Sequence, residues 1–133
     1  MAFSGLSYLA VVLAAVAGFI TGSVWYGVLG KAWMSALGKT KEDMKPTPLP
    51  FIVAGIAQLV MAFMLAGILG HLGEVTVWNG IVSAFFIWLG FILPSMAVNH
   101  AFQGAKTGLT VIDSGHWLAV LVVMGAVLGI FGV

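Results

Sequence analysis

Four long apolar stretches alternate with short polar segments along this chain. The apolar stretches cover about residues 3–29, 51–70, 75–99 and 110–133, and each can cross a hydrocarbon core of roughly 30 Å as a helix. Lipid offers no partner for backbone N–H and C=O groups, and no alternating pattern favours a barrel. The pattern therefore predicts an all-α membrane protein in which residues 1–133 form one domain, an up-and-down bundle of four transmembrane helices.

The composition supports a membrane protein and excludes several other classes. Of the 133 residues, 62% are hydrophobic and 7% are charged, which is far from the composition of soluble domains. The absence of cysteine rules out disulfides and thiolate metal sites. A formal charge of +1 provides no basic field for nucleic acid. We expect membrane lipid as a partner, no nucleic acid and no cofactor.

The lysines predict how the bundle is oriented, because cytoplasmic loops are enriched in basic residues. The first predicted loop, residues 31–49, and the third predicted loop hold all of the lysines, whereas the second loop, near residues 71–74, holds none. These lysines are Lys31, Lys39, Lys41, Lys45 and Lys106. The distribution predicts a multi-pass protein of the bacterial cytoplasmic (inner) membrane with both termini on the non-cytoplasmic side.

Two local features refine the predicted bundle. Thr40 followed three residues later by Asp43 is typical of a capping box, and it predicts a short interfacial helix in the first loop. Thr110 and Asp113 have the same spacing and predict a helix that Thr110 caps. In the third span, Pro94 lacks the N–H that a helix interior needs, so we expect a kink there.

Small residues recur at four-residue spacing in three of the spans and predict the faces on which helices pack, since small side chains let backbones approach in lipid. The packing positions that we expect are Ala14, Gly18, Gly22, Gln58, Ala62, Gly125 and Gly129. Gln58 is the strongly polar member of its row. We favour an interhelical hydrogen bond for Gln58, and the alternative is a contact with a ligand.

Polar and aromatic residues from distant segments are predicted to meet at the cytoplasmic end of the bundle. They are Trp25, Tyr26, Lys31, Asn99, His100, Asp113 and His116. One interpretation is a binding site for a polar ligand, because ionisable groups within a membrane are often functional. The other is structural, with aromatic residues and lysine anchoring helix ends at the headgroups and Asp113 capping a helix. A metal site is not favoured, since neither histidine belongs to a two-histidine helix motif.

Three segments resemble a known family of small bacterial membrane proteins. These segments are "GSVWYGVLGKAWMSALG", "TKEDM" and "VNHAFQGAKTGLTVIDSGHW", and they are similar to the family called domain of unknown function 1761. The resemblance spans nearly the whole chain and implies a four-span membrane protein without an assigned activity. It also places Gly27, Trp33 and all seven candidate site residues in the family's motif segments.

Two hypotheses for function follow. The first is a non-enzymatic protein that acts by helix association, as a homo-oligomer or an accessory subunit of a membrane complex. The second is a small-solute or ion carrier or channel that uses the polar cluster. The sequence contains no nucleophile elbow, no HExxH motif and no glycine-rich loop after a strand, so we do not expect an enzyme.

Overall fold

The computed structural model describes residues 3–133, which form an all-α bundle. Its helices are α1 (Tyr8–Leu37), α2 (Pro48–Leu72), α3 (Val77–Ile87), α4 (Leu93–Phe102) and α5 (Thr107–Phe131). When α3 and α4 are taken as one helix, Val77–Phe102, four helices in the described chain are long and apolar enough to cross a membrane. The prediction of a four-helix membrane bundle is confirmed.

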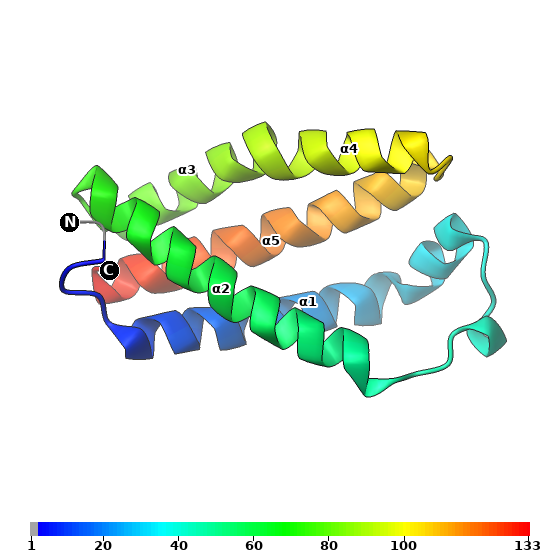
Figure 1. Cartoon of the computed structure of the whole chain (residues 1–133), viewed down its shortest axis with the longest axis horizontal. Coiled ribbons are helices and arrows are strands. Elements are labelled where there is room, and N and C mark those ends of the chain that lie inside the picture. The colour runs from blue at the N-terminus through cyan, green and yellow to red at the C-terminus, as the bar shows by residue number, and fades with distance from the viewer. Residues whose placement is uncertain (1–2) are drawn as a thin grey trace.

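The four spans run up and down. In Figure 1, α1 and α5 lie along one another, α3 and α4 follow α5, and α2 crosses α1 at an angle. The start of α1 and the end of α5 lie at the same end of the bundle, and the long loop after α1 lies at the other end. The C-terminal half of α2 lies close to the other helices, whereas its N-terminal half diverges from α5 (Figure 1).

The first helix is longer than the sequence predicts. It continues through Lys31 and ends at Leu37, where Gly38 adopts a φ of 71° and its N–H bonds back to the last turn. Such a left-handed residue after the last turn is a common helix stop. The sequence estimate ended this helix near residue 29, where apolar residues give way to polar ones, but leaving the hydrocarbon does not end a helix.

Two other helices also begin earlier than predicted. Pro48 is the first residue of α2, where its missing N–H is not needed. The fifth helix begins at Thr107, so the prediction that Thr110 caps it is wrong. Lys106 occupies the cap position, and the side chain of Thr110 is used in a contact between helices.

The capping box in the first loop is confirmed. Thr40 precedes η1 (Lys41–Asp43), a single 3-10 turn, and its backbone N–H donates to the Asp43 carboxylate at 2.8 Å. The Thr40 hydroxyl donates to the same carboxylate oxygen at 2.9 Å. These two hydrogen bonds hold the pKa of Asp43 below its ordinary value, because they favour the ionised form.

The third span is irregular just before Pro94. A π-helical turn, η2 (Trp88–Ile92), separates α3 from α4, and the path of the helix bends between them in Figure 1. Proline removes one backbone donor and its ring crowds the preceding turn, and a wider turn accommodates both effects. The predicted irregularity is therefore present, and it takes the form of a π-bulge.

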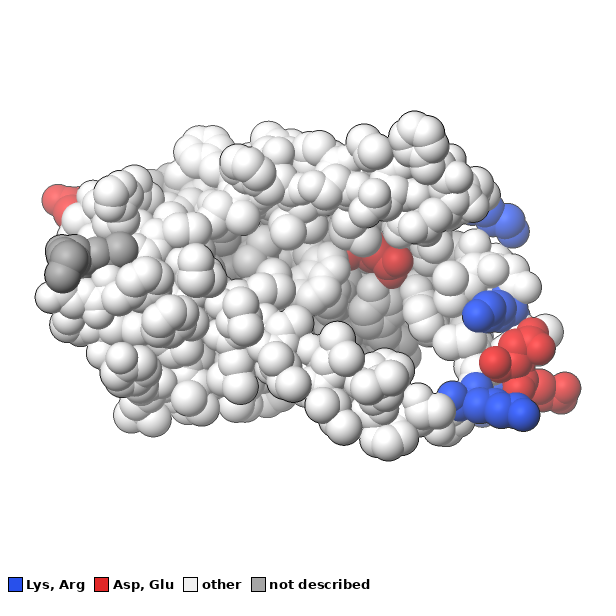
Figure 2. Space-filling view, viewed as in Figure 1, with Lys and Arg blue, Asp and Glu red and all other residues white. Residues whose placement is uncertain are grey.

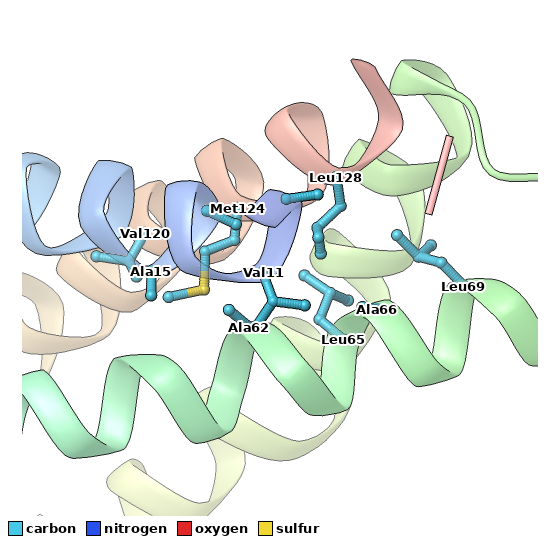
Figure 3. Close-up of a cluster of buried hydrophobic side chains, with 11 residues drawn as sticks. Val11, Ala15, Ala62, Leu65, Ala66, Leu69, Val120, Met124 and Leu128 are labelled. Atoms are coloured by element: carbon cyan, nitrogen blue, oxygen red, sulfur yellow. The ribbon is translucent and has the colours of Figure 1, made fainter. Parts of the chain in front are cut away.

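The tightly packed core lies in the half of the bundle that holds the termini. Figure 3 shows apolar side chains from α1, the C-terminal half of α2 and the C-terminal half of α5 meeting one another. They include Val11, Ala15, Ala62, Leu65, Ala66, Leu69, Val120, Met124 and Leu128. Ala10, Ala14, Gly18 and Gly22 of α1 are all buried as well. The small-residue row of α1 therefore packs inside the chain itself.

Glycine allows the closest crossing of two helices. Gly125 of α5 faces Gly80 of α3, and a Cβ atom on either residue would collide with the backbone carbonyl of the other. One turn further along α5, a Cβ on Gly129 would collide with the Thr76 carbonyl. Gly125 and Gly129 therefore lie in close contact with the backbone at Gly80 and at Thr76, the residue that precedes α3.

Candidate functional site

The centre of the polar cluster is a hydrogen bond between α1 and α5. The hydroxyl of Tyr26 donates to Oδ1 of Asp113 at 2.6 Å. Beside it, the indole Nε1 of Trp25 donates to the carbonyl of Ile112 at 3.0 Å. Gly115 makes room for this indole, because a Cβ there would lie 2.8 Å from Cζ2 of Trp25. Two neighbouring residues of α1 thus donate hydrogen bonds to one turn of α5.

This hydrogen bond lies well inside the bundle. Tyr26 precedes the end of α1 by about 17 Å at 1.5 Å per residue, and Asp113 follows the start of α5 by about 9 Å. The sequence placed Trp25 and Tyr26 at the end of their span because that span was thought to end at residue 29. The longer helix corrects this placement and moves both residues inward.

His116 lies one turn beyond Asp113 and is only 7% exposed. Its imidazole packs against Tyr26 with ring centroids 4.8 Å apart, and against Trp117 at 4.5 Å. Gly22 supplies the space, because a Cβ there would lie 2.6 Å from Nε2 of His116. Nδ1 is buried and has no hydrogen-bond partner among the described residues. Gly22 therefore accommodates a polar ring, where the sequence predicted contact between backbones.

Gln58 of α2 is 3% exposed, and its Oε1 atom has no hydrogen-bond partner within residues 3–133. The favoured prediction, an interhelical hydrogen bond, is therefore wrong for this oxygen. The amide packs over Gly18, where a Cβ would lie 2.5 Å from Oε1. A buried amide oxygen without a donor is costly, and native structures hold few of them.

Gln58 and His116 line the same cavity, which has a volume of about 300 Å³. Its walls come from α1, α2 and α5, and its remaining lining residues are Phe19, Gly22, Ser23, Tyr26, Phe51 and Ala54. Figure 2 shows a hollow over α1 between α2 and α5, with one acidic side chain visible beside it, on a face that is otherwise uncharged away from the two ends.

Of the seven predicted site residues, Tyr26 and His116 line this cavity and the other five do not. Nδ1 of His100 is 2.8 Å from the Thr110 hydroxyl, which joins α4 to α5. Asn99 and Lys31 are exposed. The seven predicted residues therefore separate into a central group of Trp25, Tyr26, Asp113 and His116 and a peripheral group of Lys31, Asn99 and His100.

Sequence reasoning missed several residues of this region. Trp88 donates from Nε1 to the carbonyl of Ser114 at 2.7 Å, so a second tryptophan holds the turn of α5 around Asp113. A tryptophan in the middle of an apolar span was the available signal, because a buried indole N–H needs an acceptor. Phe19 and Phe51 also line the cavity, but nothing distinguishes them by sequence from other lipid-facing phenylalanines.

The cavity offers hydrogen-bonding side chains to a bound molecule, whereas the Asp113 carboxylate is outside its lining. Within residues 3–133, no three His, Cys, Asp or Glu side chains come together in a group that would hold a metal ion. The cavity instead combines aromatic walls with two polar side chains whose Oε1 and Nδ1 atoms are unpaired. Such a combination is typical of a pocket for a small organic molecule.

A comparison with protein families matches residues 9–129 to the family described as "Protein of unknown function (DUF1761)". The chain belongs to this family. The match covers all four spans and thus confirms the resemblance seen in the motif segments. Comparison with curated proteins and with solved structures gave no match. Membership of this family assigns no activity.

Proposed function

We propose that this DUF1761 protein is a small-solute carrier that binds its solute in the cavity between α1, α2 and α5. The observation that supports it is that two polar residues of the bundle interior, Gln58 and His116, both line that cavity, and each also carries a buried polar atom without a partner in the described chain. Unsatisfied polar groups inside a bundle destabilise the fold, so polar residues kept at such a cost are candidates for a function. In this proposal the solute hydrogen-bonds to the parts of both side chains that face the cavity.

The unequal packing of α2 is consistent with a carrier. Its C-terminal half contributes Ala62, Leu65 and Leu69 to the tight core, whereas its N-terminal half contributes Phe51, Ala54 and Gln58 to the cavity wall. A loosely packed half-helix beside a site can move to open and close it, as gating in membrane carriers requires. The protein in this proposal moves its solute unchanged and acts without catalysis.

Solute binding takes precedence over the association hypothesis because the faces that suggested association are used within one chain. The rows containing Gly18, Gly22 and Gln58 pack against α5 or face the cavity. Association through the third span remains a second candidate, because Val77–Phe102 is the least buried of the four spans. Cross-linking of a single cysteine at Phe86 in lipid tests it, and a second copy would give a covalent dimer.

We also propose that the lysine-rich end of the bundle lies in the cytoplasm of a bacterial inner membrane, with both termini outside. The chain lacks cysteine, so single cysteines can be introduced without background labelling. A membrane-impermeant thiol reagent applied to intact cells should label Glu74→Cys and spare Lys41→Cys. The reverse pattern would invert the orientation.

The carrier proposal is tested by a thermal-shift screen of purified protein against small cations, anions and neutral organic compounds. A ligand at 100 times its Kd should stabilise the fold by about 2.7 kcal/mol. His116→Gln should abolish the shift produced by a positive compound. His100→Gln is the matched control, because it makes the same change outside the cavity, and it should retain the shift.

Compounds that pass the screen should enter proteoliposomes containing wild-type protein and not those containing His116→Gln. A screen in which none of the three compound classes shifts the melting temperature would overturn the proposal. Binding without uptake would reduce the proposed carrier to a binding protein.

A further inference from the structure

An apolar groove continues from the cavity along the outside of the bundle. It lies between α1 and the N-terminal half of α2, where the two helices cross at an angle (Figure 1), and it has a volume of about 420 Å³. The groove and the cavity share three lining residues, Phe19, Phe51 and Gln58. Val16 and Ile56 in the groove wall are 49% and 59% exposed, so in a membrane the groove is open to lipid chains.

Polarity increases from the groove to the cavity. Gln58 is the polar member of the groove lining, whose other members are aliphatic residues, phenylalanine and glycine. The cavity lining adds Ser23, Tyr26 and His116. A molecule that fills both spaces therefore needs an apolar body in the groove and a polar group in the cavity.

The lining favours an uncharged polar group. Among the described residues, no Lys, Arg, Asp or Glu belongs to the lining of the groove or of the cavity. An ionised group would lose its hydration there without a counter-charge, which is costly. The hydroxyls of Ser23 and Tyr26 donate to the Phe19 carbonyl and to Asp113, and their oxygens can still accept hydrogen bonds. A hydroxyl group on the ligand could donate to either oxygen.

The order of the two spaces along the helix matches the orientation of a lipid. On α1, the groove is lined between Val12 and Phe19 and the cavity between Phe19 and Tyr26. Because α1 runs toward the lysine-rich end, the polar space lies nearer that end and the apolar space lies deeper in the span (Figure 1). Lipids of the adjacent leaflet likewise hold their heads toward the surface and their chains toward the middle. A molecule of that leaflet could enter the groove sideways without turning over.

The groove is long enough for a medium-length chain. From Val12 to Phe19, α1 rises by about 10 Å at 1.5 Å per residue. An extended backbone advances up to about 3.6 Å over three bonds, so a chain of roughly nine bonds spans this distance. A ten-carbon probe therefore matches the groove.

Gly55 keeps part of the groove open. It lines the groove, and nothing lies within 4 Å of a Cβ atom placed on it. A large side chain at this position can therefore occupy the groove without colliding with the rest of the bundle.

We propose that the groove and the cavity together bind a single-chain amphiphile with a small, uncharged hydroxyl head, taken sideways from the leaflet at the lysine-rich end. The chain lies between α1 and α2, and the head meets Ser23, Tyr26 and the cavity-facing parts of Gln58 and His116. This inference rests on the proposed function, because it names the class of solute and its route into the same cavity.

Photolabelling in proteoliposomes tests the site on the wild-type protein. The probe is a ten-carbon primary alcohol with a diazirine in the middle of its chain, and labelled peptides are identified by mass spectrometry. We expect adducts to concentrate in residues 12–19 and 51–59, and excess 1-decanol to reduce them at least about tenfold. At equal concentration in the bilayer, decane, decanoate and decyltrimethylammonium should compete about tenfold less well, in line with the loss of one hydrogen bond.

Three variants test the assigned residues. Gly55→Phe should fill the groove and reduce labelling at least about fivefold. Gly27→Phe is the matched control, because nothing lies within 4 Å of a Cβ there and Gly27 is outside both linings, so labelling should be retained. Ser23→Ala removes a hydroxyl from an exposed position and should weaken competition by 1-decanol about fivefold, with competition by decane unchanged.

Equal competition by decane would overturn the role of the hydroxyl head, and equal competition by either charged compound would overturn the uncharged head. Labelling that is spread evenly over the spans and resists excess 1-decanol would indicate contact with bulk lipid only and would overturn the site. A second copy of the chain in the groove would exclude the probe from residues 51–59, with the same consequence. Equal labelling of Gly55→Phe and wild type would also overturn it. Each of these results leaves the carrier proposal to the thermal-shift screen, which uses other compounds.

Discussion

The space beside glycine residues is filled differently in two regions of the bundle. In the half that holds the termini, Gly125 brings α5 against the backbone of α3 at Gly80, and aliphatic side chains fill the remaining space. Between this core and the lysine-rich end, Gly18 and Gly22 make room for the polar side chains of Gln58 and His116, and a cavity remains beside them. The same residue type thus serves close backbone contact in one region and a polar pocket in the other.

The difference shows why a row of small residues does not by itself identify an oligomer interface. Small residues permit close approach, but the neighbouring helix decides whether a backbone or a long side chain occupies the space. In α1, the row is buried by side chains of the same chain, such as Met124 over Gly18.

The largest expected effect comes from breaking the backbone crossing with Gly125→Ala. The added methyl group would meet the Gly80 carbonyl, which no side-chain rotation can move. We therefore expect the free energy of unfolding to fall by about 3 kcal/mol, the upper end of the usual cost of overpacking. The measurement is the unfolding midpoint in a denaturing-detergent titration. Gly55→Ala is the matched control, because nothing lies within 4 Å of a Cβ there. An unfolding curve identical to that of the control would show that the two helices do not cross as described.

A smaller effect is expected from Tyr26→Phe beside the cavity. The change leaves the part-buried Asp113 carboxylate without its 2.6 Å donor, so we expect the free energy of unfolding to fall by about 1–3 kcal/mol, the cost of leaving such a group unsatisfied. Asp113→Asn and the double variant complete a double-mutant cycle. A coupling energy above about 0.5 kcal/mol is the expected result, and strict additivity would mean that the two side chains do not interact.

Gly22→Ala should lower the free energy of unfolding by less than Gly125→Ala does, because a side chain and not a backbone opposes the added methyl group. The methyl group would lie 2.6 Å from Nε2 of His116, but an imidazole can turn toward the cavity, so a loss of about 1 kcal/mol is expected. The combination of Gly22→Ala with His116→Ala removes the obstructing ring. On the His116→Ala background, Gly22→Ala should not lower the free energy of unfolding any further. An equal loss on the wild-type and His116→Ala backgrounds would contradict the contact between Gly22 and His116.

The smallest effect concerns the loop at the lysine-rich end. The lowered pKa of Asp43 means that its hydrogen bonds from Thr40 stabilise the loop when Asp43 is ionised. This stabilisation is present at neutral pH, because neutral pH lies above the ordinary aspartate pKa of about 3.9. The contribution is lost as the pH falls through the lowered folded value, because protonation removes the charge that accepts these bonds. Amide exchange at Thr40 should therefore accelerate at acidic pH while exchange in the helices is unchanged. A pH-independent rate after correction for intrinsic exchange would contradict the capping box.

Helix number and type were predictable because they depend on local properties. Each span is long and apolar enough to require a helix in lipid, and Thr40 with Asp43 forms a local cap whose partners are three residues apart. The helix ends were predicted less well. Lys31 marked a change in hydropathy, but α1 continued to Gly38 because nothing before that glycine interrupts its backbone hydrogen bonds.

The candidate site was only partly predictable for the same reason. Tyr26, Asp113 and His116 were found because polar residues in apolar spans are conspicuous, and the structure brings these three together. Asn99 and His100 have the same appearance in the sequence but lie outside the cavity. Their spans are equally apolar, so composition cannot distinguish a side chain that faces the cavity from one that faces outward.

The sequence by itself determined a four-span helical membrane protein, because backbone hydrogen bonding in lipid leaves no other option for such segments. Tertiary structure alone decided that Oε1 of Gln58 has no donor among the described residues 3–133, that Gly22 accommodates His116 and that Phe51 shares a cavity with both polar side chains. These facts depend on the rotation and crossing of α2 against α1 and α5. Rotation and crossing are set by contacts among residues far apart in the chain, and no local pattern records them.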